Sequence, residues 1–419
     1  MTRQSARRRA LAVLALTSVA GCATTAQSTP TPAVGAQRGE VLLGVEVLLR
    51  DSLHLLRDKR VGLITNHTGR DRQGTSTIDL LHRAPGVRLV ALFGPEHGIR
   101  GAAQAGEKVS STVDSATRIP VYSLYGETRV PTAEMLGKVD VLVYDIQDVG
   151  ARVYTYPWTM ALSAEAAGKA GKRFIVLDRP NPIRGDRVGG GILDTAFRSF
   201  VGQYPVALRY GFTPGELLRY LVGTGQVKAD ISVVPMQGWR RSMWWEETGI
   251  PWVAPSPNLR TVDAALLYPG TVFIEGTTLS EGRGTDKPFQ LVGAKWLTDA
   301  GAIARALNER RLPGVRFDST SRTIEKGQKW GGETIPMVEI TVTDRNAVKA
   351  LEVGAYLMRA IHERHRAQWE WKTAHFDRLA GGTGFRAAIE SGDLGAYFSR
   401  IDAQTASWLQ GARAYWLYQ

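Results

Sequence analysis

Cysteine and histidine are scarce in this sequence, and each scarcity excludes a kind of site. Of the 419 residues, one is cysteine (Cys22) and seven are histidine. A lone thiol cannot form an internal disulfide, so the protein depends on its core for stability. His362 and His365 lie in a charged run, which is more typical of a solvated helix face than of a metal site. The sequence therefore predicts neither a disulfide framework nor a metal centre.

Several common signatures are also missing. The sequence contains no GxGxxG, GxxxxGK[ST], GxSxG or HExxH pattern, so nothing in it indicates a bound dinucleotide or nucleotide. No Lys/Arg-rich run outside the N-terminus suggests a nucleic-acid partner. We therefore expect no cofactor and no nucleic acid.

The charge is moderately basic. The formal net charge is +12, but residues 1–21 contain four arginines and no acidic residue. Without them 48 basic residues face 40 acidic ones, an excess of +8. Such an excess suits an acidic polymer or a membrane surface nearby, and solubility alone explains it equally well.

The N-terminus carries an export signal. Arg7, Arg8 and Arg9 precede a short apolar run, residues 10–19, which is too short to span a bilayer. The ending Val19-Ala20-Gly21-Cys22 resembles the lipobox of bacterial lipoproteins, in which the cysteine is lipidated; plain secretion with a leftover cysteine is the alternative. Residues 23–39 are small, polar and proline-containing, as in a flexible tether. We expect residues 1–22 to be a lipoprotein signal peptide that ends at the lipidated Cys22. The lipid would anchor the protein in the cell envelope, on the outer membrane facing the periplasm.

The rest of the chain alternates between strand-like and helix-like patterns. Strands are predicted at residues 61–64, 87–93, 139–143 and 173–177, with helices at 77–83 and 160–170 between them. This alternation predicts an α/β fold with a parallel sheet in residues 40–260. Residues 261–419 suggest a smaller α+β domain, which begins after a proline-rich connector and includes a strand at 271–275.

Polar side chains follow each predicted strand: Asn66, Glu96, Asp145 and Asp178. Parallel strands bring these ends to one edge, where open α/β sheets bind ligands. Of these strand ends, the stretch 144–159, YDIQDVGARVYTYPWT, has the most polar and charged residues. We interpret it as the floor of an active site.

The polar residues that remain are mainly carboxylates. Glu96, in a tight turn, is suited to acid catalysis, or it caps the next helix or pairs with Arg100. Asp145, Asp148 and Arg152 are either catalytic or a buried salt-bridge cluster. The glycine-rich loop contains Glu275, Glu281, Arg283 and Asp286. These charged residues are either functional or pair with one another to hold the loop in shape.

Two carboxylates across a cleft are what glycoside hydrolysis needs. One protonates the leaving oxygen, and the other stabilises positive charge or activates water. Tyr154, Tyr156 and Trp158 suit stacking on a sugar ring, and core packing explains them almost as well.

Five motifs resemble those of the exo-β-N-acetylmuramidase family: FGPEHGIRG (93–101), YDIQDVGARVYTYPWTM (144–160), LDRPNPIRG (177–185), PSPNLRT (255–261) and YPGTVFIEGTTLSEGRGTDKPFQLVGA (268–294). The resemblance covers nearly all of the chain after the tether. It implies a Rossmann-like N-terminal domain, a smaller C-terminal domain and an active site in the cleft between them. It also implies release of N-acetylmuramic acid from the non-reducing end of peptidoglycan fragments, for cell-wall recycling or remodelling.

The resemblance places the catalytic glutamate on Glu96. For the second carboxylate we favour Asp145 and Asp148, then Glu275 and Glu281. A cation is needed for the lactyl carboxylate of muramic acid, and Arg152, Arg283 and Lys287 are candidates. The predicted substrate-binding residues are Asn66, His97, Gln147, Arg152, Tyr154, Asn258, Glu275, Glu281, Arg283, Asp286 and Lys287. A hydrolase of another wall sugar and a non-catalytic peptidoglycan-binding lipoprotein remain as alternatives.

Overall fold

The computed structural model describes residues 40–100, 107 and 110–419, which belong to one compact unit, Gly39–Gln419. We call residues 40–260 the sheet domain and residues 261–419 the small domain. The predicted signal peptide, Cys22 and the tether lie outside the described residues.

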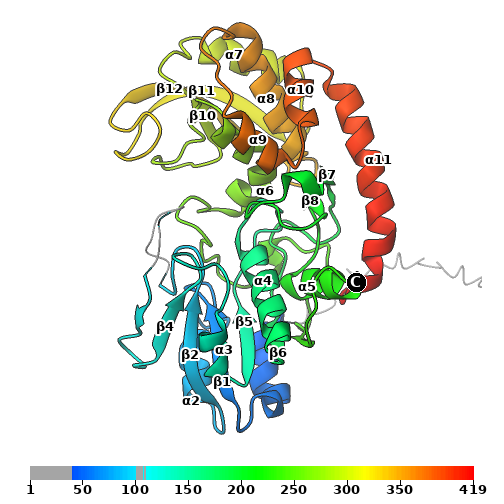
Figure 1. The fold of residues 1–419 in the computed structure, drawn as a ribbon. Coiled ribbons are helices and arrows are strands. Elements are labelled where there is room, and N and C mark those ends of the chain that lie inside the picture. Colours follow the sequence, from blue (N-terminus) through cyan, green and yellow to red (C-terminus); the bar gives the residue numbers. More distant parts are fainter. Residues whose placement is uncertain (1–39, 101–106, 108–109) are drawn as a thin grey trace, which may run out of the picture. The chain divides into compact units, whose positions relative to one another are not determined.

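In the described residues the sheet domain is built on a seven-stranded sheet (Figure 1). Its strands, in spatial order, are β3 (Thr112–Val113), β4 (Pro120–Ser123), β2 (Arg88–Gly94), β1 (Arg60–Thr65), β5 (Val141–Asp145), β6 (Arg173–Leu177) and β9 (Ile231–Val234). All neighbours pair in parallel except β3, which is antiparallel to β4 at the edge. Numbered along the chain, the parallel strands have the order 3-2-1-4-5-6, which is the Rossmann order. The predicted parallel α/β fold is confirmed.

The parallel strands are apolar on both faces, because helices cover both. In β5, Val141 and Val143 pack into one core, while Leu142 and Tyr144 pack into the other. The helices of this domain are α1 (Gly44–Val47), α2 (Thr77–Arg83), α3 (Ala133–Gly137), α4 (Tyr156–Lys169) and α5 (Pro214–Gly223), with short helical turns η1 (Leu48–Ser52), η2 (Leu53–Leu55), η3 (Thr195–Phe197) and η4 (Trp245–Thr248). A two-stranded ribbon, β7 (Gly189–Ile192) and β8 (Ala207–Arg209), was not predicted. None of the helices in the described part of the chain is long and apolar enough to cross a membrane.

The small domain has a three-stranded antiparallel sheet covered by helices (Figure 1). Its elements are α6 (Val262–Thr271), η5 (Val272–Gly276), β10 (Leu291–Gly293), α7 (Ala300–Glu309), β11 (Val315–Thr323), β12 (Thr334–Val342), α8 (Ala350–Arg364), α9 (Thr373–Ala380), α10 (Gly384–Ser391), α11 (Leu394–Ala412) and η6 (Arg413–Tyr415). The helix α11 leads the chain back to the sheet domain, where Trp408 donates a hydrogen bond to the Tyr220 hydroxyl on α5 at 2.9 Å.

The strand predicted at residues 271–275 is wrong, because α6 runs to Thr271 and a 3-10 turn, η5, follows it. The β-branched residues there favour a strand, but tertiary packing overrides that preference. Gly270 on α6 faces Gly354 on α8, and a Cβ at Gly270 would lie 1.7 Å from the Ala350 carbonyl oxygen. The two helices therefore cross closely just before α6 ends at Thr271, and the turn η5 that follows carries Glu275.

Candidate active site

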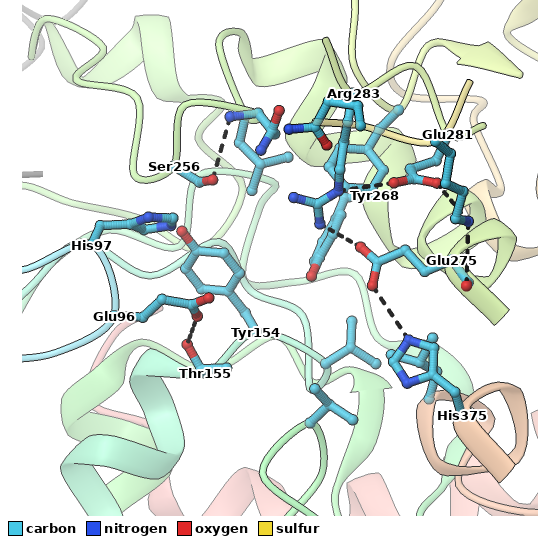
Figure 2. Close-up of a pocket in the computed structure, with 18 of the residues that line it drawn as sticks. Glu96, His97, Tyr154, Thr155, Ser256, Tyr268, Glu275, Glu281, Arg283 and His375 are labelled. Atoms are coloured by element: carbon cyan, nitrogen blue, oxygen red, sulfur yellow. Dashed lines mark hydrogen bonds and ion pairs between the residues drawn. The ribbon is translucent and has the colours of Figure 1, made fainter. Parts of the chain in front are cut away.

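One cavity of 640 Å³ is lined by both domains. Figure 2 shows Glu96 on one side of it, Glu275, Glu281 and His375 on the other, and tyrosines between them. The lining residues are Glu96, His97, Tyr125, Val153, Tyr154, Thr155, Val201, Ser256, Asn258, Leu259, Tyr268, Glu275, Glu281, Arg283, Phe289, Gly327, Gln328, Lys329, Lys372, His375 and Leu379.

Glu96 is carried by a tight turn that directly follows β2. The Gly98 amide donates to the Pro95 carbonyl at 2.9 Å, and His97 has a φ of +69°. A residue other than glycine in this left-handed region costs about 1–3 kcal/mol, and such strain is concentrated at functional sites. The turn places the Glu96 side chain in the cavity wall at the carboxyl edge of the sheet.

Two hydroxyl groups orient the Glu96 carboxyl group. Thr155, at the start of α4, donates to Glu96 Oε2 at 2.7 Å, and Tyr125 also makes a side-chain hydrogen bond to Glu96. Burial and then the charge of Glu96 raise the pKa of Tyr125 to about 12, so the phenol keeps its proton at physiological pH. Glu96 is therefore held by donors that do not titrate near neutrality.

The opposite wall comes from the turn η5 and the glycine-rich loop after it. The Arg283 guanidinium bridges two carboxylates, with Glu275 at 2.5 Å and Glu281 at 3.0 Å (Figure 2). Burial by itself raises the pKa of Glu275, but Arg283 and then His375 hold it below its usual value. Glu275 therefore stays ionised throughout the physiological pH range.

Lys329 fixes the backbone of this wall. Its Nζ lies within 3.3 Å of the carbonyl oxygens of Ile274, Glu275, Thr277 and Leu279. The same atom lies 3.0 Å from Glu281 Oε2. A single ammonium group therefore holds the loop in the shape that presents both glutamates to the cavity.

Aromatic rings form the floor between the two acidic walls. Tyr268 packs edge-on against Tyr154, with ring centroids 6.0 Å apart, and against Phe289 at 4.8 Å. Such rings offer apolar faces with a polar rim, which suits the flat apolar face of a sugar ring.

Seven of the predicted residues line this cavity: Glu96, His97, Tyr154, Asn258, Glu275, Glu281 and Arg283. They come from four separate segments, so the structure brings together residues that are up to 187 positions apart in sequence.

Asp145, predicted as a catalytic carboxylate, lies elsewhere. It is fully buried at the end of β5, where Arg179 pairs with it and the Thr77 hydroxyl donates to it. The pair occupies the switch point between β1 and β5, where Rossmann folds bind dinucleotides. Asp145 is therefore paired with Arg179 inside the protein and does not reach the cavity.

Asp148 and Arg152 are also buried and do not line the cavity. Asp148 accepts hydrogen bonds from the Tyr210 hydroxyl and the Gly150 amide, and burial raises its pKa to about 6. Arg152 donates to the carbonyls of Gly191, Val206 and Ala380 at 2.9–3.1 Å. Each has its own partners, so the proposed salt-bridge cluster of Asp145, Asp148 and Arg152 is not present.

Four further predicted substrate contacts are absent from the cavity wall. Asn66 accepts from the Thr68 amide and hydroxyl, and Gln147 donates to the carbonyls of Asp148 and Pro180. Asp286 pairs with Arg322 at 3.2 Å, and Lys287 pairs with Glu339. The first two fix turns at the edge of the sheet, and the last two belong to the outer side of the small domain's loop.

The prediction missed Tyr125, Lys329, Lys372 and His375 as cavity residues. Lys329 lies between β11 and β12, Lys372 precedes α9 and His375 lies in its first turn, all in segments that carry no recognisable motif. Aromatic residues around Lys372, at Trp369, Trp371 and Phe376, mark a packed segment and gave no hint of a site. In the ranges that the structure describes, no group of three or more metal-binding side chains is found.

The fold and the site together define a class: an α/β protein whose Rossmann-like domain shares with a second domain a cavity lined by carboxylates and tyrosines, as in a glycosidase. Residues 61–263 match the N-terminal domain, and residues 266–418 the C-terminal domain, of exo-β-N-acetylmuramidase NamZ. The chain belongs to this family.

Similar proteins agree with this assignment. The chain is 45% identical over 358 residues to the peptidoglycan β-N-acetylmuramidase NamZ of Bacillus subtilis (strain 168), covering 85% of this chain and 86% of that protein. Two crystal structures of DUF1343 family proteins from Bacteroides fragilis are also similar, each covering 91% of this chain and 99% of theirs. Their TM-scores are 0.84 at 37% identity and 0.73 at 28% identity.

Proposed function

We propose that this protein is an exo-acting glycosidase that releases N-acetylmuramic acid from the non-reducing end of peptidoglycan fragments. Family membership and the activity named for the Bacillus subtilis relative support this function. The observation that carries it is the position of Glu96, which faces two glutamates of the small domain across one cavity (Figure 2). Cleavage of a glycosidic bond uses a pair of carboxyl groups on opposite sides of the bond, and this cavity offers such a pair.

Glu96 is the general acid in this proposal. Its carboxyl group donates a proton to the glycosidic oxygen as the bond to the anomeric carbon breaks. The hydroxyls of Thr155 and Tyr125 hold the group in one orientation, which keeps the reacting atoms in line.

The second acidic group is Glu275 or Glu281. Positive charge develops on the sugar ring in the transition state, and a fixed carboxylate stabilises it. Glu275 fits because Arg283 and His375 keep it ionised, and Glu281 fits because Arg283 and Lys329 fix its position. Tyr154 and Tyr268 would pack against the sugar.

The first test is Glu96→Gln. The amide keeps the shape and the hydrogen bonds but cannot give up a proton, so we expect kcat to fall by about 10²–10⁴-fold. The assay measures release of N-acetylmuramic acid from a muramic-acid–glucosamine disaccharide. Glu333→Gln is the matched control, because Glu333 pairs with Lys295 on the surface of the small domain. Near-normal turnover by Glu96→Gln would remove Glu96 from the mechanism, and wall binding without sugar release by the wild type would leave a binding protein.

The same proposal includes attachment to the cell envelope through a lipid on Cys22, on the outer membrane facing the periplasm. The lipobox-like ending at residues 19–22 and the polar tether after it support this attachment. Cys22→Ala should move the protein from the membrane fraction to the soluble fraction. Unchanged fractionation would refute the anchor and leave the glycosidase proposal intact.

A further inference from the structure

Four basic side chains lie on the small-domain wall of the cavity, Arg283, Lys329, Lys372 and His375, and all but Lys372 have partners there. Arg283 pairs with Glu275 and Glu281, and Lys329 is surrounded by four carbonyl oxygens and Glu281. His375 lies 3.6 Å from Glu275. The two glutamates therefore balance Arg283 and Lys329, and any further positive charge on this wall is uncompensated.

Lys372 is that further charge. Among the residues that the structure describes, its ammonium group makes no hydrogen bond or ion pair, although the residue lines the cavity. Its side chain is exposed, so its charge is free to meet a ligand.

The backbone of Lys372 is nevertheless fixed beside the acidic wall. Its amide donates to the Gly276 carbonyl at 2.8 Å, and its neighbour Trp371 bridges to Thr277. Lys372 also precedes α9, and its carbonyl accepts from the amides of His375 and Phe376 at 2.9 Å. The root of the side chain is thus held next to Glu275, while its tip can move.

The electrostatics of this wall favour an anion. Burial is the main reason that the pKa of Lys329 is lowered, and repulsion from Lys372 adds to it. Two cations that repel each other are both stabilised when a carboxylate binds between or beside them. The cavity therefore offers a place for an acid group of a ligand.

We propose that Lys372 binds the lactyl carboxylate of N-acetylmuramic acid and so selects this sugar over N-acetylglucosamine. This inference rests on the proposed function. The two sugars differ only in the lactyl ether at the third carbon, so one cation at that position can distinguish them. The cations favoured by the sequence do not fit as well: Arg152 is buried away from the cavity, Lys287 pairs with Glu339, and Arg283 already bridges two acids.

The test compares two enzymes with two substrates. Wild type and Lys372→Met are assayed on a chromogenic β-N-acetylmuramide with a free lactyl acid and on the same compound with the acid converted to its methyl ester. A hydrogen bond to a charged group accounts for about a 10- to 100-fold difference in kcat/KM. With the free acid, we expect kcat/KM of Lys372→Met to fall by that factor, mainly because KM rises. With the ester, kcat/KM of the variant should equal that of the wild type. Lys372→Arg should retain most of the preference for the acid.

The controls separate selectivity from general damage. Lys295→Met removes a surface lysine of the same domain and should change neither substrate. An equal loss on acid and ester, or no loss on either, would overturn the role of Lys372. A wild type that cleaves acid and ester equally would also overturn it, whereas a wild type that cleaves neither compound would refute the proposed function itself. Because Lys372 is exposed, added salt should weaken the preference for the acid in the wild type only.

Discussion

At the residue scale, carboxylates at the ends of two strands of one sheet have different roles. Glu96 follows β2 and Asp145 ends β5, and both were predicted to be catalytic. A turn with a left-handed residue carries Glu96 into the cavity, whereas Arg179 pairs with Asp145 inside the protein. The chemistry of a side chain is the same in both places, and its partners decide its role.

Asp145→Asn should therefore affect stability rather than chemistry. The amide leaves Arg179 as an unpaired buried charge, which costs about 3–5 kcal/mol of unfolding free energy. Urea unfolding measures this loss, and kcat of the folded protein should stay close to that of the wild type. A fall in kcat as large as that of Glu96→Gln, without a loss of stability, would return Asp145 to the mechanism.

At the element scale, the periodicity of the sequence predicted the central strands of the parallel sheet correctly, but it gave a wrong strand in the small domain. The helix 77–83 and the strand 173–177 have the predicted bounds. The strand can be recognised because a buried parallel strand is a continuous apolar run. Residues 271–275 were predicted to be a strand, because their β-branched and apolar residues are typical of a strand and also occur in a buried turn. The crossing of α6 and α8 at Gly270 and Gly354 places a helix end directly before this segment, and that contact is not visible in local sequence.

The candidate site shows the same limit. Polar strand ends could be predicted to share one edge, and Asn66, Glu96, Asp145 and Asp178 do follow neighbouring strands. Which of them faces the cavity depends on distant partners such as Arg179 and Thr155. Lys329 and Lys372 reach the cavity through the folding of the small domain, so no motif marks them.

The C-terminal segment is an element whose role appears only in the structure. After α11, the Tyr418 hydroxyl donates to Asp178 at 2.6 Å, the Leu417 amide donates to Glu216, and the Gln419 carbonyl accepts from the Arg241 amide. The segment thus supplies partners to two buried acids of the sheet domain, Asp178 and Glu216.

Deletion of residues 416–419 should destabilise the sheet domain. Loss of hydrogen bonds to buried carboxylates costs about 1.5–3 kcal/mol each, so the unfolding free energy should fall by more than about 2 kcal/mol. Tyr418→Phe removes one hydroxyl and should give a smaller part of the loss. Equal stability of the deleted and full-length proteins in urea would show that the contacts contribute nothing.

At the scale of the whole molecule, buried acids set how stability depends on pH. Burial raises the pKa of Asp148 to about 6 and that of Asp178 to about 7. Between about pH 4 and pH 7 these two acids are therefore protonated in the folded protein and ionised in the unfolded chain. Stability from these groups is present at low pH and is lost as the pH rises through their folded values.

Asp148→Asn tests this dependence directly. Asp148 Oδ2 accepts hydrogen bonds from the Tyr210 hydroxyl and the Gly150 amide, and burial outweighs both and raises the pKa of the group. A shift of roughly two pKa units corresponds to about 3 kcal/mol, which the wild type should lose relative to the variant between pH 4 and pH 8. Urea unfolding of both proteins at several pH values measures the difference, and Asp178, which is present in both, cancels. If the two stability curves run parallel, Asp148 is ionised in the folded protein and its burial does not shape the response to pH.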